Sequence, residues 1–189
     1  MSDQLIAIHE RLMAATTEKA KASIRNFVPH AEKVYGVTMP LLNELAKEFK
    51  TGGFPLVKEL WKSGAYEERI LAAKLLGKVC RKDPVLSLQL AERFSKDISN
   101  WAVCDAMGMQ ALKPVAGKIR EEIFLLAEKL VLSDNPWQRR YSLVLVEVFT
   151  KDQTAGKRIG RLVQELEKDE DYYVRKAVSW IKRNLSKGR

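Results

Sequence analysis

Trp101 and Asp105 are the two side chains of this sequence best suited to bind or stabilise a cation. They are four residues apart, so they share one face of any helix that contains them. The face of an indole ring attracts cations, and so does a carboxylate. On residue type alone, however, a tryptophan is more often part of the core, and an aspartate in the first helical turns can be solvated or can pair with an arginine such as Arg140. The pair therefore needs support from other positions.

An internal repeat supplies that support. Four segments at the starts of expected helices can be aligned: Ala65–Arg69, Trp101–Asp105, Pro136–Arg140 and Asp171–Arg175. Their last residues are spaced by 36, 35 and 35 positions, and an aromatic residue precedes each last residue within a few positions. This period is typical of stacked helix pairs, in which one helix of each pair lines the concave side. We therefore expect the aligned positions to project from one surface.

The aligned row holds three arginines and one acid, namely Arg69, Arg140, Arg175 and Asp105. A row of arginines suits a phosphate backbone. A carboxylate in that row repels the same backbone, and a protein that only binds DNA has little reason to carry it. Trp180, five residues after Arg175, could provide a second aromatic wall beside Trp101. The row thus predicts a small pocket for a positively charged species, open to DNA.

The elements that must position these residues are helices, because apolar residues recur at helical spacing almost throughout. We expect helices over residues 2–14, 17–28, 38–50, 55–62, 65–80, 84–95, 98–110, 116–132, 136–150, 154–166 and 170–186. Thr38 can cap one of them, and Asp83-Pro84 and Asn135-Pro136 each read as an N-cap followed by proline at the first helical position. No segment alternates cleanly as a strand would. The prediction is an all-α fold, an α-solenoid of antiparallel helix pairs forming a single domain over residues 1–189.

The charge of the chain indicates which kind of partner it binds. The net charge is +9 in 189 residues, and no acid follows Asp171, which indicates a polyanionic partner, either nucleic acid or an anionic membrane surface. A membrane-surface role is the weaker alternative, because no helix combines a Trp/Leu face with a continuous Lys/Arg face. No apolar run approaches the roughly 18 residues that a membrane span needs.

The cysteine and histidine content argues against metal and disulfide chemistry. Cys80 and Cys104 are too few for a disulfide framework, and the first residues lack the features of a secretory signal. With two histidines and no Cys-x-x-Cys, a zinc site is not expected. We therefore expect a cytoplasmic protein with reduced thiols, no cofactor and no metal.

Four segments resemble the successive signatures of one known family. They are Tyr35-Gly-Val-Thr-Met-Pro40, Asn100-Trp-Ala-Val-Cys-Asp105, Asn135-Pro-Trp-Gln-Arg-Arg140 and Lys176-Ala-Val-Ser-Trp-Ile-Lys-Arg183. In this order and spacing they resemble the AlkD family, bacterial and archaeal DNA glycosylases of alkylation repair that are built from HEAT-like (ARM-like) repeats. The resemblance runs from about residue 30 to residue 187. No single motif is decisive, but the four together are specific.

The resemblance implies removal of N3- and N7-alkylated purines from double-stranded DNA, without flipping the base into a deep pocket. Asp105 matches the catalytic carboxylate, and Trp101 and Trp180 match the tryptophans that pack on the deoxyribose at the lesion. Arg140 matches the arginine at the lesion's phosphate. We expect DNA contacts from a set of basic residues: Arg139, Arg140, Arg175, Arg183 and Lys187. A monomer is expected.

A single carboxylate is sufficient for this chemistry. Ordinary glycosidases use two carboxyl groups, one of which protonates the leaving group. A cationic alkylpurine leaves without being protonated, so only the oxocarbenium-like sugar and the attacking water need help. The alternative is a non-catalytic HEAT-like module that binds DNA or a protein, in which Asp105 has a structural role. The joint presence of Trp101, Asp105, Arg140 and Trp180 favours the enzyme.

Overall fold

The computed structural model describes residues 2–187, and this part of the chain is helical without any strand. The α-helices are α1 (Asp3–Ala14), α2 (Glu18–Phe27), α3 (Met39–Glu48), α4 (Gly53–Lys62), α5 (Tyr66–Val79), α6 (Pro84–Ser95), α7 (Trp101–Ala106), α8 (Arg120–Leu130), α9 (Pro136–Val146), α10 (Gly156–Glu165) and α11 (Tyr172–Lys187). Short 3-10 turns extend or join several of them. The predicted all-α class is confirmed.

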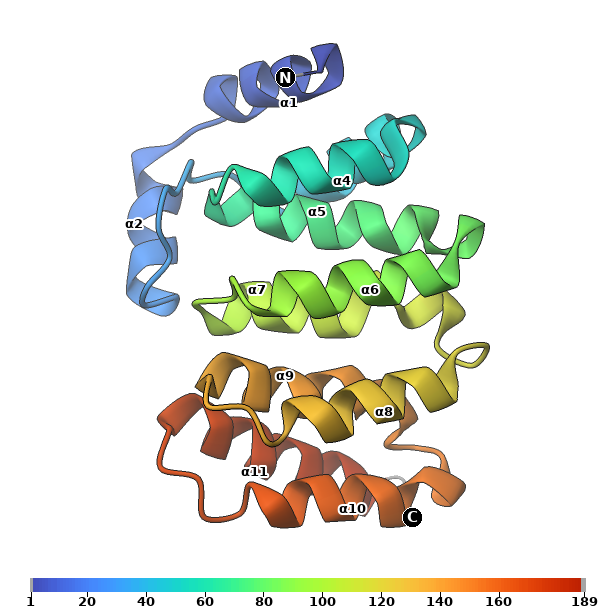
Figure 1. The fold of residues 1–189 in the computed structure, drawn as a ribbon. Helices are drawn as coiled ribbons and strands as arrows, with labels where there is room; N and C mark the ends of the chain where they lie inside the picture. The colour runs from blue at the N-terminus through green and yellow to red at the C-terminus, as the bar shows by residue number, and fades with distance from the viewer. Residues whose placement is uncertain (1, 188–189) are drawn as a thin grey trace.

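The helices stack in two layers (Figure 1). From α4 onward they run as pairs, α4 with α5, α6 with α7, α8 with α9 and α10 with α11. In one layer α5 packs against α3 and α7, and α9 packs against α7 and α11. The other layer consists of α4, α6, α8 and α10, and α6 contacts α8 there. This arrangement is the α-solenoid that the repeat spacing predicts.

The helices begin where the capping residues place them. The Asp83 carboxylate accepts a hydrogen bond from the amide of Leu86 at 2.9 Å, and Asn135 accepts one from the amide of Trp137 at 2.9 Å. Asn100 caps α7 by accepting from Val103 N at 3.0 Å, which sets where Trp101 and Asp105 lie on that helix. Thr38 stands at the N-cap of α3, but its side chain makes no capping bond. The expected N-cap position is confirmed there, and the expected capping bond is not formed.

The single helix expected over 98–110 is instead an α-helix followed by a π-helical turn. α7 ends at Ala106 and continues as a π-helical turn, η3 (Met107–Ala111). The neighbours on both sides approach this turn closely at glycines. A Cβ at Gly77 of α5 would lie 2.5 Å from the carbonyl oxygen of Gln110, and a Cβ at Gly108 would lie 2.5 Å from the Val144 side chain of α9. The wider turn begins two residues after Asp105, and such turns occur frequently at functional sites.

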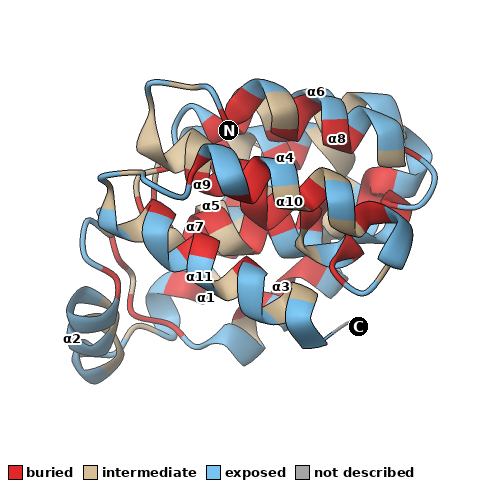
Figure 2. Cartoon of the chain, turned by 90° about the horizontal axis from the view of Figure 1, so that it is seen from below, coloured by how far each residue is buried: buried red, intermediate tan, exposed pale blue. Residues whose placement is uncertain are grey.

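The N-terminal part of the described chain is attached to the stack through two buried acids of α5. The Glu67 carboxylate accepts backbone N–H bonds from Tyr35, Gly36 and Val37 at 2.9, 2.7 and 3.3 Å. Glu68 accepts from the Tyr35 hydroxyl and lies 2.9 Å from Nε2 of His9. These bonds hold the segment that follows α2, whereas α2 itself buries no residue and extends away from the rest of the fold (Figure 2).

Neither a membrane-spanning helix nor a cluster of metal ligands occurs within residues 2–187. None of the helices described there combines the length and the apolar content required to cross a membrane. The same residues hold no cluster of three or more His, Cys, Asp or Glu side chains placed to bind a metal ion.

Candidate functional site

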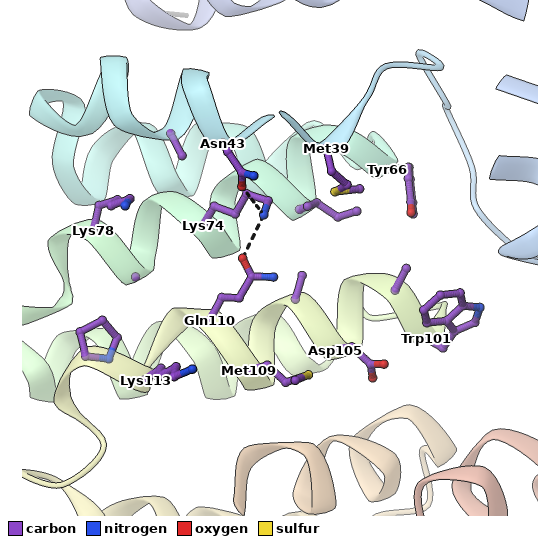
Figure 3. A pocket seen from close by; sticks show the side chains of 16 residues that line it. Met39, Asn43, Tyr66, Lys74, Lys78, Trp101, Asp105, Met109, Gln110 and Lys113 are labelled. Atoms are coloured by element: carbon purple, nitrogen blue, oxygen red, sulfur yellow. Dashed lines mark hydrogen bonds between the residues drawn. The ribbon is translucent and has the colours of Figure 1, made fainter. Parts of the chain in front are cut away.

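A groove with a volume of about 640 Å³ runs along α3, α5, α7 and η3. Trp101 and Asp105 lie at one end of it with Tyr66, and Lys74, Lys78 and Lys113 lie toward the other end (Figure 3). The groove therefore has an aromatic and acidic end and a basic end. The sequence pair is brought into one open site, as its four-residue spacing predicts.

Asp105 is joined to the next repeat by an ion pair. Its Oδ1 lies 2.6 Å from Nη2 of Arg140, and the side chains are 25% and 7% exposed. Arg140 also donates through Nη1 to the carbonyl of Tyr173 at 2.8 Å. The two contacts link α7, α9 and the start of α11. Oδ2 of Asp105 has no hydrogen-bond partner among the described residues, so one carboxylate oxygen stays available in the groove.

Burial raises the pKa of Asp105 above its ordinary value, and the charge and hydrogen bond of Arg140 offset part of that rise. The raised pKa means that the anion is less well stabilised here than in water. A cation that enters the groove would supply the missing stabilisation, and it would do so in surroundings where water screens charges only weakly. The site thus favours a positively charged partner for Asp105.

Trp101 lies between the groove and a second cavity. Its Nε1 donates to the carbonyl of Phe27, the last residue of α2, at 3.0 Å. The second cavity has a volume of about 360 Å³, and its lining residues are Asn26, Phe27, Pro29, Trp101, Arg140, Tyr172, Tyr173 and Lys176. Phe27 is 74% exposed and Tyr172 is 54% exposed, so these aromatic rings are available to a ligand.

Trp180 does not form the expected second wall. It is half-buried on α11 and lines neither of the two cavities that Trp101 lines. Tyr172 and Tyr173 take that place in the second cavity, and Tyr173 packs on Trp137 with ring centroids 5.1 Å apart. The aligned segment Asp171–Arg175 already contained this signal, since both tyrosines precede its arginine.

A comparison with protein families assigns the chain. Residues 8–189 match the model of a family described as DNA alkylation repair enzyme. The chain belongs to this family. The resemblance seen in the sequence motifs is confirmed, and the family makes DNA the substrate of this repair enzyme. A search of curated proteins found no significant match.

The basic residues predicted to contact DNA fall into two groups. Those near the helix starts are already engaged: Arg139 pairs with Asp169 at 2.6 Å, and Arg175 donates to the carbonyls of Asp169 and Glu170. Arg183 and Lys187 are exposed on α11. Arg140 of the expected row is largely buried and pairs with Asp105, and it also lines the second cavity. That these residues bind DNA stays a prediction.

The repair enzyme also carries a polar cluster that the sequence did not reveal. Nζ of Lys74 lies 2.7 Å from Oδ1 of Asn43 and 3.0 Å from Oε1 of Gln110. Burial lowers the pKa of Lys74, and the nearby charge of Lys78 lowers it further. An ammonium group only donates, so both amides turn their oxygens inward and their NH2 groups outward. No motif marks this cluster, because its members come from α3, α5 and η3.

Proposed function

We propose that this DNA alkylation repair enzyme is a glycosylase that hydrolyses the N-glycosidic bond of cationic N3- and N7-alkylated purines in duplex DNA. The observation that carries the proposal is the state of Asp105. Its carboxylate is three-quarters buried, one oxygen is held by Arg140, and the other has no partner among the described residues and belongs to the groove wall. A carboxylate so arranged suits a developing sugar cation better than it suits a phosphate.

The charge on the substrate explains why one carboxylate is sufficient. An alkylated purine that already carries a positive charge leaves without a proton donor, so the usual second carboxyl group is not needed. Asp105 then stabilises the oxocarbenium-like sugar and orients the attacking water. A carboxylate about 4 Å from a unit cation contributes about 4 kcal/mol at an effective dielectric constant of about 20. That energy corresponds to roughly a thousandfold in rate.

This magnitude also determines which bases are removed. A thousandfold acceleration is useful for a bond that is labile because its base is cationic, and it is far too small for an undamaged neutral base. The substrate is then selected by its reactivity, and a tight base-reading pocket is not required. Trp101 packs on the deoxyribose in this proposal. Trp180 is one turn beyond Lys176 on α11, so it lies on the face that includes Lys176 and reaches DNA there.

The test is release of 7-methylguanine from methylated duplex DNA under single-turnover conditions. Asp105→Asn should lower the release rate by roughly a thousandfold and leave DNA affinity unchanged or improved, since it removes a negative charge near the backbone. Asp134→Asn, the same change at an exposed turn residue, is the matched control and should release base normally. Equal release rates for wild type and Asp105→Asn would refute the catalytic assignment.

One observation favours a second candidate, a repair protein that binds DNA without cleaving the glycosidic bond. The Asp105–Arg140 ion pair joins neighbouring repeats, which is a sufficient structural reason for an acid at this position. In that case Asp105→Asn lowers stability by about 1–3 kcal/mol, and the wild-type protein releases no methylated base. Release by the wild type therefore separates the two candidates.

A further inference from the structure

A polar pocket outside the groove has no assigned role. Its volume is about 260 Å³, and it lies at the turns that precede α5 and α7. Its lining residues are Glu32, Lys33, Lys62, Ser63, Gly64, Tyr66, Arg69, Ser99 and Asn100. The lining includes three basic side chains and a single acid, and that acid is exposed.

Two of the cations converge on one point in this pocket. Gly64 has φ of +76°, which disfavours any other residue. The point where its Cβ would be lies 3.7 Å from Nζ of Lys33 and 3.8 Å from Nη2 of Arg69. A side chain at position 64 would occupy the space between the ammonium and the guanidinium groups. Glycine leaves that space open.

The converging cations are not neutralised within the described part of the chain. Lys33 donates to the carbonyl of Ser63 at 3.2 Å, and Nη1 of Arg69 donates to the carbonyl of Asp97 at 2.7 Å. Neither side chain forms an ion pair with a described acid, and Nε of Arg69 is buried without an acceptor. The two acids in the first turn of α5 bind elsewhere, Glu67 to the amides of residues 35–37 and Glu68 to Tyr35 and His9.

The chemistry of this pocket matches a phosphate. A guanidinium and an ammonium that converge without an ion-paired carboxylate can bind phosphate oxygens with short, charge-assisted hydrogen bonds. Lys62 adds a third positive charge at the rim. A carboxylate ligand would satisfy the same groups, but the substrate of this family is DNA, whose backbone presents a phosphate at every nucleotide.

The pocket adjoins the aromatic and acidic end of the groove. Tyr66 lines both, and it stands at the same end as Trp101 in Figure 3. Asn100, which caps α7, precedes Trp101 directly. A DNA strand that places its lesion beside Asp105 would therefore pass close to Lys33 and Arg69.

We propose that the pocket formed by Lys33, Gly64 and Arg69 binds a backbone phosphate of the DNA strand whose lesion lies at Asp105. This inference rests on the proposed function for the position of the lesion. The bound phosphate fixes the strand along the groove, so these residues act as positioning residues. It also gives Arg69, the first arginine of the aligned row, a part in DNA binding.

The test measures how DNA affinity depends on salt for the full chain. Fluorescence anisotropy with a short undamaged duplex gives the slope of log Kobs against log salt concentration, to which each phosphate bound by the protein contributes about one unit. Lys33→Gln should reduce the slope by about one unit, and Lys62→Gln should reduce it by less. Lys58→Gln, an exposed lysine of α4, is the matched control and should leave it unchanged.

The outcomes separate this inference from the proposed function. A slope that is unchanged in Lys33→Gln, with a wild-type thermal unfolding temperature, would overturn the phosphate site even if the protein releases 7-methylguanine. A reduced slope supports the site even if no base is released. Inorganic phosphate at constant ionic strength provides the second arm: a phosphate pocket predicts that it displaces DNA from the wild type better than chloride does, and that this difference is lost in Lys33→Gln. Binding of inorganic phosphate with an unchanged DNA slope in Lys33→Gln would overturn the assignment to DNA.

Discussion

Asp105 joins two repeats through one carboxylate oxygen and presents the other to the groove. The same partner that anchors it, Arg140, also moderates its pKa, because burial raises the pKa and the guanidinium lowers it. The contact that fixes the position of the Asp105 carboxylate therefore also affects its pKa. A carboxylate without Arg140 would be more difficult to ionise, and one without burial would be screened by water.

The pH dependence of base release follows from this balance. The ionised carboxylate stabilises the sugar cation, so the rate should fall as pH drops through the raised pKa of Asp105. Arg140→Gln removes the group that lowers this pKa, so the acidic limb of the profile should move to higher pH. Single-turnover rates across pH, for wild type and for Arg140→Gln, check this. An acidic limb that moves to lower pH in Arg140→Gln would contradict this prediction.

Close approach of helices is the feature that orders the site at the scale of elements. The π-helical turn η3 is held between α5 and α9 because Gly77 and Gly108 carry no side chains where these elements meet. Gln110 can then reach Lys74, and Asp105 can reach Arg140. The glycines act on the site through the backbone distances that they permit, and Gly77 also lines the groove.

Paired substitutions of glycine test this role. Gly108→Ala should destabilise the fold by about 1–3 kcal/mol, because its Cβ would lie 2.5 Å from Val144 in a closely packed interface. Gly160→Ala on α10 adds a Cβ with nothing within 4 Å and should instead stabilise the protein by about 0.5–1 kcal/mol through helix propensity. Urea unfolding of both variants measures the two free energies. Equal effects would show that packing at η3 has no special importance.

The distribution of charge is the property of the whole molecule that bears most directly on DNA. The net charge is +9, but many arginines are occupied within the stack, such as Arg158, which binds Glu121 and Glu128 at 2.7 and 2.5 Å. On α11 the basic residues Lys176, Arg183 and Lys187 share a face with Trp180, opposite the buried Val174, Ala177 and Ile181. Lys176 of that face also lines the second cavity.

A double substitution tests whether this face meets DNA. Arg183→Gln with Lys187→Gln should reduce the salt slope of DNA binding by up to about two units, since each phosphate that a basic residue neutralises adds about one. Lys157→Gln with Arg161→Gln is the matched control, because these exposed residues of α10 have the same types and the same four-residue spacing. Anisotropy titrations at several salt concentrations give both slopes. If the α10 pair reduces the salt slope as much as the α11 pair does, the prediction that DNA binds preferentially to the α11 face is refuted.

The sequence by itself determined the helices, their pairing and the family. These rest on local information: apolar periodicity, Asp83 and Asn135 at helix starts, and motifs with a period near 35 residues. The placement of Trp101 beside Asp105 was also local, since four residues make one helical turn.

Only the tertiary structure decided which side chains complete the site. It buried Arg140 against Asp105, put Tyr172 and Tyr173 where Trp180 was expected, and brought Lys33 to Arg69. Each of these arrangements depends on the angle and distance between helices that are far apart in the sequence. Packing of whole helix surfaces sets those distances, and no spacing within one helix encodes them.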